Sequence, residues 1–138
     1  NMFNIRKGIQ TVTKLNNKSL LQTNYISKMA VTSINTPAEF QSQVLTAQDG
    51  KVKIVDFYAT WCGPCKAIAP MIEKWSTNQY ADANVDFFKV DVDVVGDVAR
   101  EQEVSAMPTF ILFKDGQRVD QIIGADLRGL KTKLDAQL

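Results

Sequence analysis

One feature restricts the fold of this 138-residue chain more than any other. A strongly apolar segment is followed almost directly by a predicted helix that contains both cysteines. Residues 52–59 are the most apolar strand candidate, which indicates a buried central strand. A helix is predicted from Cys62 to about Tyr80, with apolar side chains on one face: Ile68, Ile72 and Trp75. Because alternating strands and helices form sheets with parallel pairs and helices on their faces, we expect one α/β domain.

The chain after residue 30 continues this alternation. Further strands are predicted at residues 31–34, 85–92, 109–113 and 118–123, the last two forming a hairpin around the turn Lys114-Asp115-Gly116. A short helix is predicted at residues 96–103. The last helix has one apolar stripe: Leu127, Leu130, Leu134 and Leu138.

Two helices contain proline or capping signals. The first helix is expected to begin with Thr36 as N-cap, Pro37 at the first helical position and Glu39 completing a capping box. Phe40, Val44 and Ala47 would form its inward face, and Asp49-Gly50 would end it. In the cysteine helix, Pro70 is expected to cause a kink, because it lacks the N–H that its turn requires.

Charge divides the chain near Met29. Residues 1–29 contain five basic residues and no acidic residue, whereas residues 30–138 contain the other 11 basic and all 15 acidic residues. A basic, acid-free segment with Ile5, Ile9 and Val12 at helical spacing is typical of a mitochondrial targeting peptide. We therefore expect an extension at residues 1–29, a globular domain at residues 30–138 and a mitochondrial location. A disordered or non-native extension is the alternative, and a start at Met29 would suit a cytoplasmic product.

Composition excludes several classes of function. A net charge of +1 gives no reason to expect nucleic acid or a membrane surface as a partner. No apolar run approaches the ~20 residues that cross a bilayer. Histidine is absent, which removes Ser-His and Cys-His catalysis and every metal site that contains histidine.

The two cysteines, Cys62 and Cys65, are separated by Gly63-Pro64. Such a pair is either a redox centre or half of a zinc site, and zinc would need two further soft ligands that this chain lacks. A metal site shared between two chains and a pair of inert buried cysteines remain as alternatives. At a strand-to-helix junction, the helix N-terminus favours a negative charge and so increases the thiolate fraction of the first cysteine. The position of the pair therefore favours redox chemistry.

The cysteine segment resembles the active site of the thioredoxin family, close to its fungal branch, over the residues Val55-Asp56-Phe57-Tyr58-Ala59-Thr60-Trp61-Cys62-Gly63-Pro64-Cys65-Lys66. Further matches occur at residues 89–93, 106–109 and 124–125, and the resemblance covers residues 31–138. It implies the thioredoxin fold, a central mixed β-sheet of five strands flanked by four helices. It also implies a thiol–disulfide oxidoreductase without a cofactor.

The resemblance assigns roles to four residues. Cys62 would attack a substrate disulfide, and Cys65 would resolve the mixed disulfide. Asp56 matches the buried carboxylate that serves as base for Cys65, and Lys89 matches its partner cation. A solvent-exposed Asp56 is the alternative, because the alternation along its strand leaves its burial undecided.

The resemblance also implies a substrate-binding surface. Met107-Pro108 matches a cis-proline that would hold the Met107 backbone for pairing with an extended substrate and would shield the thiols from metal; a trans proline that opens the following strand is the alternative. The other residues of a flat, mostly apolar surface around Cys62 would be Trp61, Gly63, Pro64, Gly124 and Ala125. Tyr58, where many members have a second tryptophan, is expected to be neutral for the mechanism.

The expected function is reduction of protein disulfides in support of cell redox homeostasis. The resemblance implies a monomer that is reduced by an NADPH-linked thioredoxin reductase and acts on protein disulfides such as those of peroxiredoxin-type targets. Gly63-Pro64 belongs to reductants, whereas oxidising members commonly have histidine there. An oxidase or isomerase of the same fold, or a redox-silent binding subunit, is the alternative.

Overall fold

The computed structural model describes residues 30–138; the predicted extension at residues 1–29 lies outside the described residues. Within residues 30–138, five strands form one mixed sheet in the order β1-β3-β2-β4-β5. Their bounds are Thr32–Ile34 (β1), Val52–Tyr58 (β2), Val85–Asp91 (β3), Thr109–Lys114 (β4) and Gln117–Ile123 (β5). The predicted strands and the central place of the apolar β2 are therefore confirmed.

The sheet is parallel on one side of β2 and antiparallel on the other. This strand runs parallel to β3 and antiparallel to β4, and β3 is also parallel to β1. Strands β4 and β5 form the predicted hairpin, but its turn is Asp115-Gly116, because Lys114 still pairs with Gln117. Both turn residues have positive φ, 50° and 77°, as a two-residue turn between twisted strands requires.

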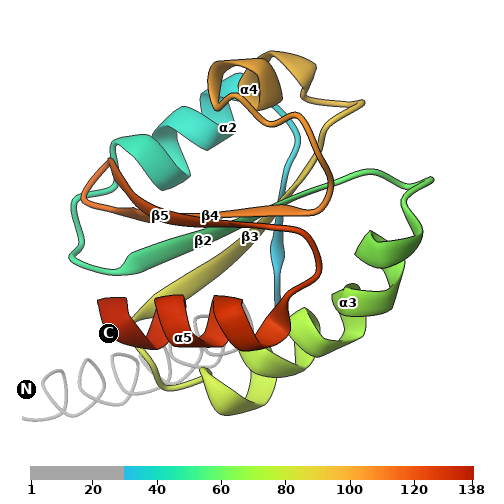
Figure 1. The fold of residues 1–138 in the computed structure, drawn as a ribbon. Helices are drawn as coiled ribbons and strands as arrows, with labels where there is room; N and C mark the ends of the chain where they lie inside the picture. The colour runs from blue at the N-terminus through green and yellow to red at the C-terminus, as the bar shows by residue number, and fades with distance from the viewer. Residues whose placement is uncertain (1–29) are drawn as a thin grey trace, which may run out of the picture.

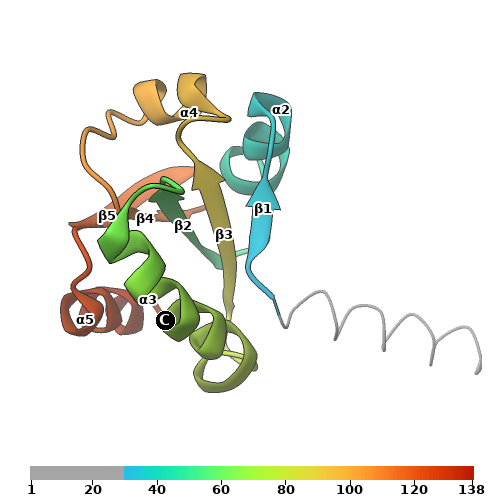
Figure 2. The ribbon, with the colours of Figure 1, turned by 90° about the vertical axis from the view of Figure 1, so that its right-hand side faces the viewer.

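Four helical segments cover the two faces of the sheet in the described part of the chain (Figure 1). Their bounds are Pro37–Phe40 (α2) continuing as Gln41–Leu45 (η1, π-helical), Gly63–Lys74 (α3) continuing as Trp75–Gln79 (η2, π-helical), Gly96–Glu101 (α4) and Leu127–Gln137 (α5). Helices α2 and α4 lie on one face, and α3 and α5 lie on the other (Figures 1 and 2). The expected architecture of a mixed five-stranded sheet with four helices is confirmed.

Each face of the sheet has its own apolar core. On one face, Phe40 and Val44 pack with Phe57 and Phe113. On the other, the buried stripe of α3 and η2 meets Leu130 and Leu134 of α5. Because both faces are covered, six of the seven residues of β2 are buried, including Lys53 and Asp56. Leu138 is an exception to the predicted stripe, since it lies beyond the last turn of α5 and is exposed.

The start of α2 follows the predicted capping pattern with one difference. Thr36 Oγ1 accepts a hydrogen bond from the Glu39 N–H at 3.1 Å. The Glu39 carboxylate accepts from the N–H of Asn35, one residue before the N-cap, at 2.7 Å. The helical segment ends at Leu45 rather than at Asp49-Gly50, because the Thr46 N–H closes a wide final turn onto the Gln41 carbonyl.

The helix predicted from Cys62 to Tyr80 consists of α3 and η2 in direct succession. Its stripe of Ile68, Ile72 and Trp75 is buried as expected. Pro70 lies inside α3, where the helix continues through it to Lys74. The expected kink at Pro70 stays a prediction.

Candidate active site

Cys62 lies at the point where the central strand becomes a helix. The three residues after β2 form a turn, and the Cys62 N–H donates to the Ala59 carbonyl at 3.2 Å. Cys62 is the N-cap of α3, and its Sγ accepts a hydrogen bond from the Cys65 N–H at 3.2 Å. Free N–H groups at a helix N-terminus stabilise negative charge. The site therefore favours a thiolate on Cys62 whenever the pair is reduced.

Cys62 and Cys65 are joined by a disulfide, with their Cα atoms 5.3 Å apart. Both residues are buried, and they form a small apolar cluster with Ala59, packed against Tyr58 and Met107. Placement within one helical turn lets the pair alternate between dithiol and disulfide with little movement of the backbone. This arrangement can exchange a disulfide with another molecule.

Asp56 lies beneath the disulfide on β2, and its burial resolves what the strand pattern left undecided. The residue is only 7% exposed, and its Oδ1 atom has no hydrogen-bond partner among residues 30–138. Burial raises the pKa of this carboxyl to about 7, and the positive charge of Lys89 partly opposes that rise. A carboxyl that titrates near neutral pH can accept and return a proton.

A cavity of about 260 Å³ connects Asp56 with the redox pair. Asp56, Cys65 and Lys89 contribute to its wall, together with Tyr58 and Lys66. The volume is large enough for several water molecules. Its wall is mostly apolar, and the polar groups of Asp56, Lys66 and Lys89 offer hydrogen bonds to water there. Water in this cavity can carry a proton between the carboxyl and the Cys65 sulfur.

The Met107–Pro108 peptide bond is cis, as the resemblance implies. Met107 presents its backbone to the disulfide, with its carbonyl oxygen 3.5 Å from Cys62 Sγ. The Pro108 carbonyl accepts a hydrogen bond from the Gly124 N–H at 2.8 Å, which holds the end of β5 against the proline. The structure thus brings Met107, Pro108 and Gly124 together beside Cys62.

Trp61 is exposed next to Cys62 and is held by a residue that the sequence analysis did not identify. Its indole N–H donates to the Asp93 carboxylate at 2.9 Å. Two other large apolar residues without a predicted role, Val94 and Ile123, are 64% and 60% exposed. For Asp93 the only sequence signal was its place in the motif at residues 89–93.

Residues 31–136 match the family model described as Thioredoxin, which covers more than half of the chain. The chain belongs to the thioredoxin family. Thioredoxin-1 of Saccharomyces cerevisiae is 56% identical over 106 residues, which are 77% of this chain and 97% of the yeast protein. Thioredoxin-2 of the same yeast is 50% identical over 101 residues, which are 73% of this chain and 92% of that protein. The fungal-type resemblance is therefore confirmed.

A solved structure of the same family has the same fold. Mitochondrial thioredoxin 3 from Saccharomyces cerevisiae in its oxidised form superposes with a TM-score of 0.68 and 40% identity, over 81% of this chain and 97% of that one. With the family and its cysteine pair both present, the chain is a dithiol–disulfide reductase whose redox centre is Cys62–Cys65. Thioredoxins act on protein disulfides and are generally reduced by a thioredoxin reductase.

The thioredoxin site gathers the residues that sequence reasoning selected. Cys62, Cys65, Asp56 and Lys89 meet at the disulfide and the cavity beneath it. The residues of the expected docking surface are exposed or half-buried, except for the buried Pro108: Trp61, Gly63, Pro64, Met107, Gly124 and Ala125. Residues 30–138 contain no group of three or more acidic, histidine or cysteine side chains placed to bind a metal. They also contain no helix long and apolar enough to span a membrane.

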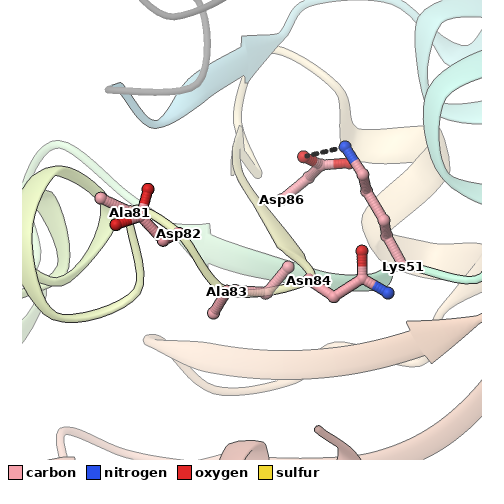
Figure 3. Close-up of a pocket in the computed structure, with 7 residues that line it drawn as sticks. Lys51, Ala81, Asp82, Ala83, Asn84 and Asp86 are labelled. Carbon is pink, nitrogen blue, oxygen red and sulfur yellow. Dashed lines mark ion pairs between the residues drawn. The ribbon is translucent and has the colours of Figure 1, made fainter.

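A second hollow, of about 140 Å³, lies at the opposite end of the strands, next to the N-terminal end of β3 (Figure 3). Lys51 and Asp86 form an ion pair there at 3.8 Å. The redox pair follows the C-terminal end of β2, and β2 runs parallel to β3, so the two sites lie at opposite ends of the sheet. The hollow contributes no group to the thioredoxin chemistry.

Proposed function

We propose that Cys62 is the nucleophile, Cys65 the resolving thiol and Asp56 the base in reduction of protein disulfides. The Cys62 thiolate attacks one sulfur of a substrate disulfide. The substrate S–S bond breaks, one substrate thiolate leaves, and a mixed disulfide with Cys62 forms. The Cys65 thiol then loses its proton to the Asp56 carboxylate and attacks Cys62 Sγ. This step releases the second substrate thiolate and forms the Cys62–Cys65 disulfide, so two electrons pass to the substrate.

One observation carries this assignment: the unpartnered Asp56 oxygen and Cys65 share one cavity. A buried carboxyl without a hydrogen bond is costly unless it has another use, and its pKa of about 7 suits reversible proton transfer at neutral pH. Lys89 opposes the rise in that pKa and so keeps a share of Asp56 ionised. We therefore propose that Lys89 acts through Asp56, by the effect of its positive charge on the pKa of that carboxyl.

The cysteine roles can be tested with Cys62→Ser and Cys65→Ser. The first variant should lose reduction of insulin disulfides by dithiothreitol above the uncatalysed rate, because no nucleophile remains. The second should accumulate a covalent mixed disulfide with substrate, detectable by mass spectrometry. Unchanged turnover in Cys62→Ser would contradict the proposal. Accumulation of a mixed disulfide on Cys65 in that same variant would also contradict it.

The direction of the reaction can be tested by equilibration with glutathione. Gly63-Pro64 supports a reducing pair, so the Cys62–Cys65 disulfide should remain oxidised in buffers where much of the glutathione is reduced. A pair that is fully reduced at a low ratio of reduced to oxidised glutathione would instead indicate an oxidase or isomerase.

We propose an NADPH-linked thioredoxin reductase as the electron source and peroxiredoxin-type proteins among the targets. A structural neighbour from work on thiol resolution in a yeast mitochondrial 1-Cys peroxiredoxin, via glutathione/thioredoxin systems, supports this target class. Coupled oxidation of NADPH with a purified reductase and peroxiredoxin is the direct test. No NADPH consumption above that of the reductase alone would contradict it.

We propose a mitochondrial location and residues 1–29 as its targeting segment, followed by the domain at residues 30–138. The five basic residues and the absence of acids in this segment support the proposal. Sequencing the N-terminus of the protein isolated from mitochondrial and cytosolic fractions tests it. A cytosolic protein that starts near Ala30 would contradict it and favour initiation at Met29.

A further inference from the structure

Val94 lies in an exposed position that local structure does not explain. It follows β3 in the turn at residues 91–95, where Gly, Asn, Asp and Ser are the usual residues. Its two apolar neighbours behave differently, since Val95 is buried and Val92 packs against the cores. Val94 is 64% exposed. An apolar residue that contradicts the preference of its turn is a candidate for function rather than stability.

Hydrogen bonds hold the backbone of the turn that contains Val94. The Asp91 carbonyl accepts from the N–H groups of Val94 and Val95, at 3.1 and 2.9 Å. The Asp91 carboxylate accepts from the Asp93 N–H at 2.9 Å. The Val92 N–H donates to the Tyr58 carbonyl at 2.9 Å, which attaches the turn to the end of β2. These hydrogen bonds fix the backbone conformation of the turn in which Val94 is exposed.

The same turn is joined to the redox site through Trp61. Asp93, the neighbour of Val94 in the chain, accepts the Trp61 indole N–H at 2.9 Å. Trp61 and Val94 are the two most exposed large apolar residues of the described chain, at 66% and 64%. The hydrogen bond from Trp61 to Asp93 holds the turn that contains Val94 against Trp61, next to Cys62.

We infer that Val94 is a specificity-determining residue that binds an apolar side chain next to the disulfide of a protein substrate. This inference rests on the proposed function, because the substrate must present its disulfide to Cys62. A side chain flanking the attacked cysteine reaches beyond Trp61 and covers the Val94 methyl groups. Burial of apolar surface on both partners then favours substrates with apolar flanks over substrates with polar ones.

Two symmetrical peptide disulfides test the inference. In one, cysteine is flanked on both sides by Leu, and in the other by Ser, so either sulfur offers the same flanks. The pre-reduced protein is mixed with excess peptide, and the second-order rate constant of reduction is measured by chromatography. We expect the wild-type protein to prefer the Leu peptide by about 3- to 5-fold, as partial burial of one valine allows.

Val94→Ser should abolish most of this preference, and Val94→Ile should keep it. Val119→Ser is the matched control, because Val119 is an exposed valine of β5. It lies four residues, about 13 Å, along the strand from Ile123, which ends β5 next to Gly124 of the redox site. A Leu preference in Val94→Ser equal to that of the wild type would overturn the inference. Failure of the proposed function looks different, since the wild-type protein would then reduce neither peptide.

Discussion

Asp56 and Lys89 are register partners on the parallel strands β2 and β3, yet no ion pair joins them within the described residues. In the same part of the chain, the Asp56 Oδ1 atom also lacks a hydrogen-bond partner. The lysine charge thus acts on the carboxyl only from a distance, and burial has the larger effect. This balance sets the pKa of Asp56 at about 7 rather than at its ordinary value of 3.8.

Asp56→Asn should remove a pH dependence of stability. The unfolded chain releases this proton near pH 3.8, whereas the folded protein holds it to about pH 7. The contribution to the free energy of unfolding is therefore fully present below pH 3.8 and is lost as the pH rises through 7, by roughly 4 kcal/mol. Urea unfolding of both oxidised proteins should show the variant gaining about this much relative to wild type between pH 4 and pH 8. A constant difference would contradict the assignment.

Lys89→Met should shift the pH profile of reduction to higher pH. Without the lysine charge, nothing offsets the effect of burial, so the pKa of Asp56 rises further and less carboxylate is present at pH 7. We expect the rate of the resolving step at pH 7 to fall about twofold and to recover above pH 8. Lys114→Met, at the far end of β4, is the matched control and should leave the midpoint unchanged. Equal midpoints in wild type and Lys89→Met would refute the electrostatic role.

Lys53→Met should destabilise the protein in a pH-dependent manner. The Lys53 side chain is 3% exposed, and its ammonium contacts Asp49 at 2.8 Å and Asp86 at 2.6 Å. Burial by itself would raise the pKa of Asp49, but the hydrogen bonds and charges of Lys53 and Lys51 lower it. The contribution of Asp49 to stability is thus present above its unfolded pKa and is lost as the pH falls through the lower folded pKa.

We expect a loss of about 1–2 kcal/mol at pH 7 in Lys53→Met, because both carboxylates keep contact with water. The loss should shrink at pH 3. Lys51→Met is the control, since its ammonium lies 3.8 Å from Asp86 and is more exposed, and it should cost less than about 0.5 kcal/mol. Urea unfolding at the two pH values measures both. A larger loss at pH 3 than at pH 7 would be evidence against this ion-pair group.

Gly116→Ala should cost more stability than Gly50→Ala. Both glycines have positive φ, 77° and 73°, so alanine is strained at either position by about 1 kcal/mol. A Cβ at Gly116 would also collide with the Leu45 carbonyl oxygen, whereas one at Gly50 would meet open space. Thermal unfolding should show Gly116→Ala less stable than Gly50→Ala by about 2 kcal/mol. Equal losses would mean that the hairpin turn moves away from Leu45 without cost.

Local sequence signals were sufficient for most elements of the fold. Each of these signals depends on residues that are close together in the sequence: the strand and helix periodicity, the Thr36 cap and the position of the cysteines. The errors occurred at the ends of elements. Backbone hydrogen bonding at these ends determines three features: the final turn of η1, the exposed position of Leu138 and the two-residue turn at Asp115.

The sequence by itself determined the order of the elements and the redox pair at a strand-to-helix junction, because these features are written in contiguous residues. Only the tertiary structure decided that Asp56 is buried, since helices cover both faces of β2 and alternation therefore carries no information there. It also decided that Asp93 accepts a hydrogen bond from Trp61 and that Val94, the next residue in the chain, is exposed. Those relationships join residues about 30 positions apart, and packing alone sets the distances and the burial on which their chemistry depends.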